Sequence, residues 1–308
     1  MSNFVFLLII YIGIYSILAL SQNLITGFTG LLSICQAGFF AIGVYTTAIY
    51  LVNTNGSFFL ALLLSAIFSF MAGLLIGLPS LKLRGDYLAI ATLGFGEIVK
   101  NVIINWDKLT RGPLGINNIP PLKIASFVFT NSNKLFYAIF IWIFVLIFYL
   151  FLERLIKSRF GRALEAIRED EIAASSMGIN TTLYKVSAFS LSAFIAGIAG
   201  SLWAIYHQSV SPQSFDFLMS VMILCMVVLG GMGNNFSSII GAALIVTTSE
   251  LPRLLGFSSI IPPQTNQIIF GLLLILMMIY RPEGILKRKR INFEYLIEKK
   301  FEKPEGGI

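Results

Sequence analysis

Ionisable residues within the apolar segments are few, and they mark the places where this chain could act on a ligand. Glu97 is the deepest, in the segment LAIATLGFGEIVKN, and Thr92 precedes it by about one and a half helical turns. Arg84 and Asp86 flank Gly85 where the same segment begins. Because a charge in lipid is costly, we expect these side chains to line a pathway or its gate. For Glu97, a structural hydrogen bond between helices is an equal alternative.

Catalytic and metal-binding chemistry has few residues to draw on. The chain holds one histidine, His207, and two isolated cysteines, Cys35 and Cys225. We expect His207 to be structural and the cysteines to be small core residues, so no catalytic or metal site is predicted. No GxxxxGK[S/T] motif occurs, so a P-loop for ATP is excluded. Any ATP and Mg²⁺ would bind to partner subunits, and this chain is predicted to need no cofactor.

The composition places these residues in a membrane protein. Apolar residues make up 56% of the 308 positions and charged residues 12%, and mean hydropathy is +0.84. Soluble domains carry about 25% charged residues. The apolar segments have the length of membrane-crossing helices and predict an all-α polytopic bundle of about eight to ten spans. The expected spans are 3–20, 24–50, 57–78, 86–105, 134–152, 182–206, 214–232, 236–251 and 265–280.

Glycine interrupts two of these apolar segments. The run 27–43 combines four glycines with Gln36, and the run 230–241 (GGMGNNFSSIIG) combines glycine with asparagine and serine. Such a mixture is typical of a broken helix beside a cavity, where backbone freedom and polar partners are both needed. We therefore include Gln36 among the pathway candidates. A plain turn between two helices explains the run 230–241 equally well.

The distribution of Lys and Arg predicts the orientation. Three segments that alternate to one side hold sixteen of the 22 basic residues, two in 79–85, six in 153–185 and eight from Arg281 onward. This side is expected to be cytoplasmic, with the C-terminus. The net charge of +7 is then explained by topology and contact with lipid headgroups, and nucleic-acid binding is not predicted.

A charged island, 161–180 (GRALEAIREDEIAASSMGIN), stands between two long apolar segments on the basic side. Its pattern predicts one amphipathic helix, and Gly178 before Ile179 is a plausible left-handed stop. A short exposed helix with mixed charges and small residues is suited to dock into another protein. A solvated connector between two spans is the alternative.

Six motifs resemble the LivM-type permeases of branched-chain amino acid ABC transporters. They cover about residues 24 to 286, and Arg111 departs from the family, which more often has glycine there. The extension 287–308 also lies outside the family pattern and is expected to be a charged cytoplasmic tail, while 1–286 form the permease domain. The motifs are GLLSICQAGFFAIGVY (30–45), LRGDYLAIATLGFGEIV (83–99), TRGPLGI (110–116), the island 161–180, MVVLGGMG (226–233) and YRPEGI (280–285).

The resemblance implies a permease of the bacterial inner membrane that works by alternating access. It would pair with a second, LivH-like permease, two cytosolic ATPases and an extracytoplasmic binding protein that docks on the 106–133 connection. The loop 153–181 would carry the coupling helix that fits the ATPase. The coupling residues so implied are Gly161, Arg162, Ala166, Ile167, Arg168, Glu169, Asp170, Glu171, Ala173, Ala174 and Gly178.

Other functions stay open at this point. A secondary transporter or channel would work alone and could use Glu97 as a proton site. A membrane-embedded enzyme would need convergent catalytic groups, which one histidine and scattered carboxylates do not offer. Within ABC importers, urea or short-chain amides are alternative cargoes.

Overall fold

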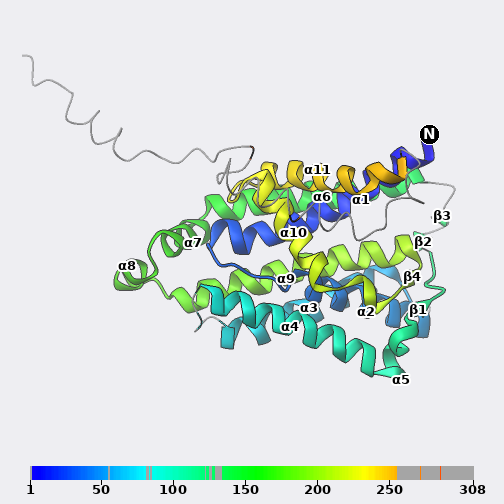
Figure 1. Ribbon diagram of the computed structural model, residues 1–308, viewed down its shortest axis with the longest axis horizontal. Coiled ribbons are helices and arrows are strands. Elements are labelled where there is room, and N and C mark those ends of the chain that lie inside the picture. The colour runs from blue at the N-terminus through cyan, green and yellow to red at the C-terminus, as the bar shows by residue number, and fades with distance from the viewer. Residues whose placement is uncertain are drawn as a thin grey trace, which may run out of the picture.

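The computed structural model describes residues 2–54, 56–80, 83, 85–121, 123–124, 127–128, 134–254, 271 and 285. Long helices run roughly along one direction and form an elongated bundle (Figure 1). Its longer helices are α1 (Ser2–Asn23), α2 (Gln36–Thr54), α3 (Phe58–Ser80), α4 (Asp86–Asn105), α6 (Lys134–Lys157), α9 (Thr181–His207), α10 (Phe217–Gly230) and α11 (Asn235–Leu254). The shorter ones are the π-helical turn η1 (Leu24–Phe28), α5 (Asp107–Thr110), η2 (Gly112–Leu114), α7 (Arg159–Glu169), α8 (Glu171–Ser176) and η3 (Pro212–Ser214).

The all-α polytopic class is confirmed. Seven helices in the described part of the chain are long and apolar enough to cross a membrane. The expected segment 236–251 forms α11, which is not among these seven. The expected span 265–280 and the tail 287–308 lie outside the described residues. The count of eight to ten spans therefore stays a prediction.

The predicted second span is wrong at its start. Instead of beginning at residue 24, the first helix continues through η1 to Phe28, and α2 begins only at Gln36. Residues 29–35 between them are not helical, and Gly30 has a φ of +71°. We call 29–35 the broken segment. The run 230–241, by contrast, is a plain turn, because α10 ends at Gly230 and α11 begins at Asn235.

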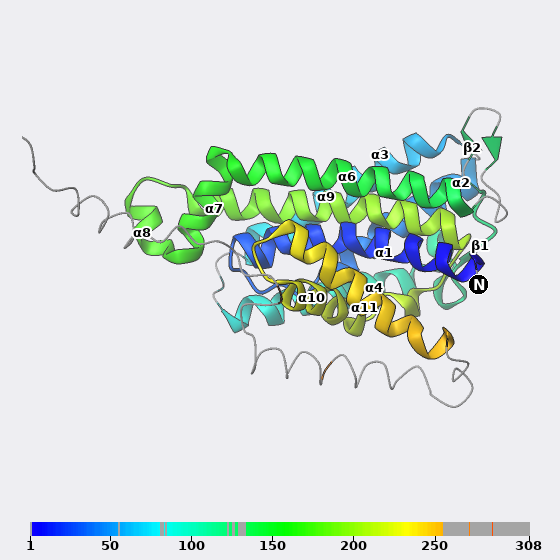
Figure 2. The ribbon, with the colours of Figure 1, turned by 90° about the horizontal axis from the view of Figure 1, so that it is seen from above.

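Helix α9 forms the centre of the bundle, with α2 and α3 packed along it (Figure 2). Small residues permit this close approach, and Ser192, Ala196 and Gly200 of α9 are all buried. A Cβ atom added to Gly73 of α3 would lie 2.7 Å from the Cβ of Ala193 on α9. A larger side chain would push the two helices apart.

The two ends of the bundle differ. Helices α7 and α8 project from one end, opposite the N-terminus and α5 (Figure 1). At the other end, β1 (Ile116–Asn117) pairs antiparallel with β4 (Ser209–Val210), and β2 (Lys123–Ile124) pairs with β3 (Phe127–Val128). Arg111 adopts a left-handed φ of 61° just before β1. Glycine adopts this conformation without strain. This gives a physical reason why the family that the motifs resemble more often has glycine where this chain has Arg111.

We expect Gly73→Leu to lower the thermal stability of the purified protein, because the larger side chain would overlap α9. Overpacking of this kind costs about 1–3 kcal/mol. Gly94→Ala on α4 is the matched control, since an added Cβ there meets no atom within 4 Å. The measurement is thermal unfolding in detergent, and equal melting temperatures for the two variants would contradict the packing.

Candidate functional site

The broken segment is partly buried, and side chains of other helices bond to two of its backbone groups. The Ile34 amide donates to Thr92 Oγ1 of α4 at 3.0 Å, and the Ser33 carbonyl accepts from Gln22 Nε2 of α1 at 2.8 Å. Where α2 begins, the Ala37 amide donates to Ser220 Oγ of α10 at 3.1 Å. Within a membrane only internal partners serve such groups. The segment is therefore tied to α1 and α4, and the start of α2 to α10, each by a single hydrogen bond.

Gln36 supports this arrangement from inside the bundle. Its side chain is fully buried, and Nε2 donates to Ser21 Oγ of α1 and, at 3.4 Å, to Ser192 Oγ of α9. The Ser192 hydroxyl in turn donates to the Ser21 carbonyl at 2.8 Å. Gln36 thus ties α2 to α1 and α9 and does not line the pocket described next, so its assignment as a pathway residue stays a prediction.

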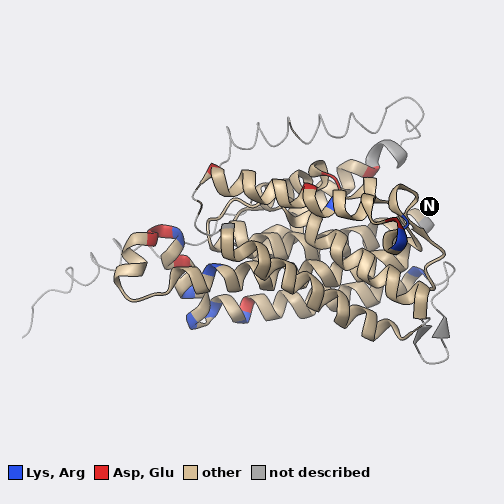
Figure 3. Ribbon diagram, turned by 90° about the horizontal axis from the view of Figure 1, so that it is seen from below, with Lys and Arg blue, Asp and Glu red and all other residues tan. Residues whose placement is uncertain are grey.

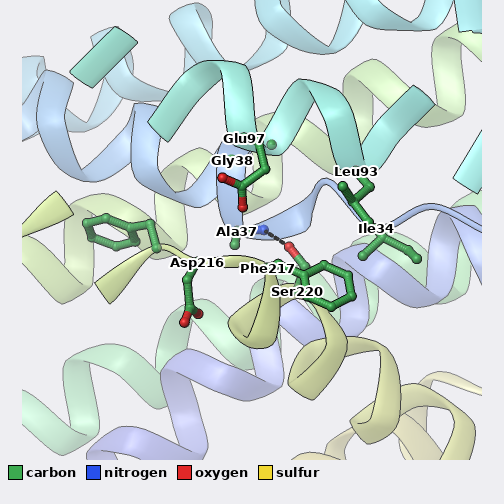
Figure 4. A pocket seen from close by; sticks show the side chains of 10 residues that line it. Ile34, Ala37, Gly38, Leu93, Glu97, Asp216, Phe217 and Ser220 are labelled. Atoms are coloured by element: carbon green, nitrogen blue, oxygen red, sulfur yellow. Dashed lines mark hydrogen bonds between the residues drawn. The ribbon is translucent and has the colours of Figure 1, made fainter. Parts of the chain in front are cut away.

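A small pocket lies between α4, the end of the broken segment and the start of α10. Glu97 leans into it from α4, and Asp216 and Ser220 approach from the other side (Figure 4). Its interior has space for about one water molecule, so in this conformation it would not hold an amino acid. The lining residues are Ile34, Ala37, Gly38, Leu93, Gly96, Glu97, Phe215, Asp216, Phe217 and Ser220.

The other predicted pathway residues are not brought together at this pocket. Thr92 is fully buried on α4, next to Leu93 in the sequence. Its hydroxyl accepts from the Ile34 amide and donates to the Ala89 carbonyl. Asp86 is exposed in the first turn of α4, where a carboxylate is favoured by the helix dipole. Arg84 lies outside the described residues. Of the predicted set, Glu97 alone lines the pocket.

The charged island forms two short helices instead of one. Asp170 separates α7 from α8, with an extended φ of −155°, and its Oδ1 accepts from the Ile172 and Ala173 amides at 2.8 and 3.0 Å. A side chain that caps a new helix here outcompetes continuation of the old one. At the other end Gly178, with a φ of +83°, closes α8, as predicted. The Ile179 amide donates to the Ala174 carbonyl at 3.2 Å in a Schellman arrangement.

The two helices expose only part of the set of residues expected to dock. On α7 the apolar face packs against α6, α9 and η1, so Ile167 is only 4% exposed. Gly161, Ala163 and Ala174 are buried too. The burial of Gly161, Ile167 and Ala174 within this chain corrects their assignment as contacts to a partner. Arg162, Glu169, Asp170, Ala173 and Gly178 are exposed, and Ala166 is half-buried.

Two charged contacts fasten α7 and α8 to the bundle. Arg168 Nη1 donates to the Gly27 carbonyl in η1. Glu171, the first residue of α8, forms an ion pair at 2.5 Å with Lys185 of α9, which is 3% exposed. Figure 3 shows most of the coloured Lys, Arg, Asp and Glu residues gathered at this end of the bundle. Arg168 and Glu171, both predicted as coupling residues, are thus engaged within the chain.

Sequence reasoning missed several residues of the site. Ile172 and Met177 of the α8 region are 63% and 84% exposed, and their apolar character could have marked them as contact residues. The side chain of Asp216 caps α10, since it accepts from the Met219 amide at 3.0 Å. Its position directly before an apolar run was the available signal. Nothing in the sequence marked Lys185 as the partner of Glu171.

Comparison with known proteins identifies the family. Residues 4–278 match the model of the branched-chain amino acid transport system permease component. The chain belongs to this permease family. The match includes α4 with Glu97, the broken segment, and α7 with α8. No solved structure is significantly similar to the chain.

Relatives of two kinds are found. The chain is 40% identical to the high-affinity branched-chain amino acid transport system permease protein LivM of Salmonella typhimurium, over 90% of this chain and 68% of that protein. It is 26% identical to the probable LivM permease of Methanocaldococcus jannaschii, over 92% and 94% of the two chains. It is also 23% identical to the LivH permease of Salmonella typhimurium, over 90% and 92%.

Asp170→Ala should loosen α8, because the Ile172 and Ala173 amides would lose their capping carboxylate. Loss of an N-cap costs about 1 kcal/mol, which corresponds to roughly five-fold faster amide exchange. Hydrogen exchange followed by mass spectrometry over residues 170–178 measures this. Asp170→Asn keeps an acceptor and should stay close to the original chain. Unchanged exchange in Asp170→Ala would contradict the cap.

Glu97→Gln should leave assembly intact and lower ATP-driven uptake about five-fold or more, because the variant keeps the volume in the pocket but removes the charge. Uptake by proteoliposomes and the subunit content of the purified complex are measured together. Glu153→Gln, which removes one partner of an exposed ion pair with Lys157, is the control. Normal uptake by Glu97→Gln would contradict a role for the charge in transport. Glu97 would then have only the structural role of a hydrogen bond between helices.

Proposed function

We propose that this chain is a permease subunit of an ATP-driven importer that takes up branched-chain amino acids delivered by a binding protein. The observation that carries the proposal is the 40% identity to a LivM permease over 90% of the chain. The seven apolar helices and the short helices α7 and α8 agree with such a role. The chain is a transport subunit of the inner membrane.

A second permease is the expected partner in the membrane. LivM and LivH relatives both occur in Salmonella typhimurium, and both resemble this chain over nearly its full length. Two related permeases of similar fold are suited to face each other around a central path. The pocket beside Glu97 holds about one water, so we infer that the path opens only with the partner present or in another conformation.

The ATPases are proposed to bind at α8. Its exposed residues include Ile172 and Met177, while Asp170 and Glu171 fix the helix by a cap and an ion pair. Large apolar side chains held on a rigid, protruding element are typical of an interface. The concentration of Lys and Arg at this end supports its cytoplasmic placement, with the C-terminus on the same side. ATP and Mg²⁺ would bind to the ATPases.

The binding protein is proposed to dock at the opposite end. Trp106 and Leu114 are 54% and 84% exposed there, next to β1 and β4. The Thr110 hydroxyl donates to the Ile103 and Trp106 carbonyls at 2.6 and 2.8 Å, which holds this connection against α4. In alternating access, ATP-driven closure of the ATPases would move α8, and release of cargo would occur at this outer end.

Reconstitution tests the proposal directly. The chain is purified with the proteins encoded beside it and placed in liposomes with ATP inside and radiolabelled leucine, urea or acetamide outside. We expect leucine uptake that requires ATP, two ATPases, a second permease and the binding protein. Uptake by the chain alone without ATP would instead indicate a secondary transporter. Uptake of urea or acetamide but not of leucine would show that the cargo is an amide and not a branched-chain amino acid.

Replacement of Ile172 by Glu should reduce the amount of ATPase that co-purifies with the permease, because a charge would replace an apolar contact on α8. Loss of such a contact costs about 2 kcal/mol or more, or at least roughly thirty-fold in affinity. Thr182→Glu, at an exposed position in the first turn of α9, is the control outside α8. Undiminished ATPase content in Ile172→Glu would place the interface elsewhere.

A further inference from the structure

Arg168 holds α7 to η1 and to the broken segment that follows it, at one point in each. Its Nη1 donates to the Gly27 carbonyl, and its aliphatic stem passes directly over Gly30. A Cβ atom added to Gly30 would lie 2.9 Å from Arg168 Cγ, and the φ of Gly30 is +71°. Gly27 and Gly30 belong to the turn 27–30, where η1 ends and the broken segment begins. A bond from a charged guanidinium is stronger than a neutral one.

The turn under Arg168 is held from its other side by the connection between α10 and α11. Asn23 Oδ1 accepts from the Gly233 amide at 2.9 Å, and Asn23 Nδ2 donates to Asn235 Oδ1 at 3.2 Å. Asn23 and Asn235 are almost fully buried. If the turn 27–30 moves, either the connection between α10 and α11 or the broken segment must move with it.

The segment that follows leads to the pocket. Ile34 donates its amide to Thr92 of α4 at 3.0 Å and also lines the pocket beside Glu97. A continuous series of contacts thus leads from Arg168 of α7, through Gly27, Gly30 and the broken segment, to Thr92 of α4. A non-helical segment held by single side-chain hydrogen bonds is the kind of element that can adopt two arrangements.

We propose that Arg168 is a positioning residue that transmits the movement of α7 and α8 to the broken segment, and so to the pocket beside Glu97. The proposal rests on the proposed function, since it needs an ATPase that moves these helices. It assigns Arg168 to a contact within the chain and leaves contact with the ATPase to the exposed residues of α8. Lysine would be a poor substitute, because it lacks the planar fork of donors.

The native Cys35 reports on the broken segment. Cys35 and Cys225 are the cysteines of the chain, and both are fully buried. In a Cys225→Ala background, the labelling rate of Cys35 by a small thiol reagent is measured in the reconstituted complex, with and without ATP. With Arg168 present we expect ATP to change this rate about ten-fold. In Arg168→Gln the response should be lost while the bound ATPases and basal ATP hydrolysis are retained.

Arg159→Gln is the matched control, because Arg159 is an exposed arginine on the same helix and should keep the ATP response. If Arg168→Gln fails to assemble, Arg168→Lys takes its place, and a reduced response with normal ATPase content supports the proposal. Three results would overturn the proposal. They are a full ATP response in the Arg168 variant that is measured, no ATP response with Arg168 present, and loss of the ATPases from both Arg168→Gln and Arg168→Lys. Absence of ATP-driven uptake by the unmodified complex would instead refute the proposed function.

Discussion

A stretch of backbone that is not helical must find hydrogen-bond partners inside the bundle, and much of this structure depends on that constraint. An unpartnered buried amide or carbonyl costs about 1–3 kcal/mol. Within residues 29–35, the Ser33 carbonyl accepts from Gln22 of α1 and the Ile34 amide donates to Thr92 of α4. At the start of α2, the Ala37 amide donates to Ser220 of α10. Helices α4 and α10, far from this region in the sequence, are therefore linked to it by hydrogen bonds.

The docking end depends on the same region. Arg168 anchors α7 to the Gly27 carbonyl, and the ion pair of Glu171 with the buried Lys185 anchors α8 to α9. The residues that fasten these helices are charged, whereas the large exposed side chains of α8 are apolar. In the charged island, Arg168 and Glu171 attach the two short helices to their own bundle, whereas Ile172 and Met177 are exposed.

Apolar length and periodicity were sufficient to predict much of the fold from the sequence. The boundaries 86–105 are those of α4, and the predicted 182–206 differs from α9 by one residue at each end. The break at 29–35 was indicated by its glycines but placed too early, because Leu24–Phe28 are apolar enough to continue the first helix. The division of the island at Asp170 was also missed. Whether an aspartate caps a helix depends on local backbone geometry, which an amphipathic pattern does not contain.

The site could be predicted only in part for a related reason. Glu97 was found because a charge in an apolar segment is conspicuous, and it does line the pocket. Gln36 does not line it, and an amide beside glycines looks the same in sequence whether it faces a cavity or joins three helices. Ile167 was misplaced because an amphipathic helix has an apolar face, but the sequence does not say whether its own chain or a partner covers it.

The dependence of the broken segment on side chains from other helices is tested most directly by the exchange of the Ile34 amide. Hydrogen exchange of the peptide that contains Ile34 is compared between the original chain and Thr92→Val, which keeps the shape of Thr92 and removes its hydroxyl. We predict slow exchange in the original chain, comparable to that of the buried helices, and faster exchange at Ile34 in the variant. Fast exchange in the original chain, or equal protection in both, would contradict this account.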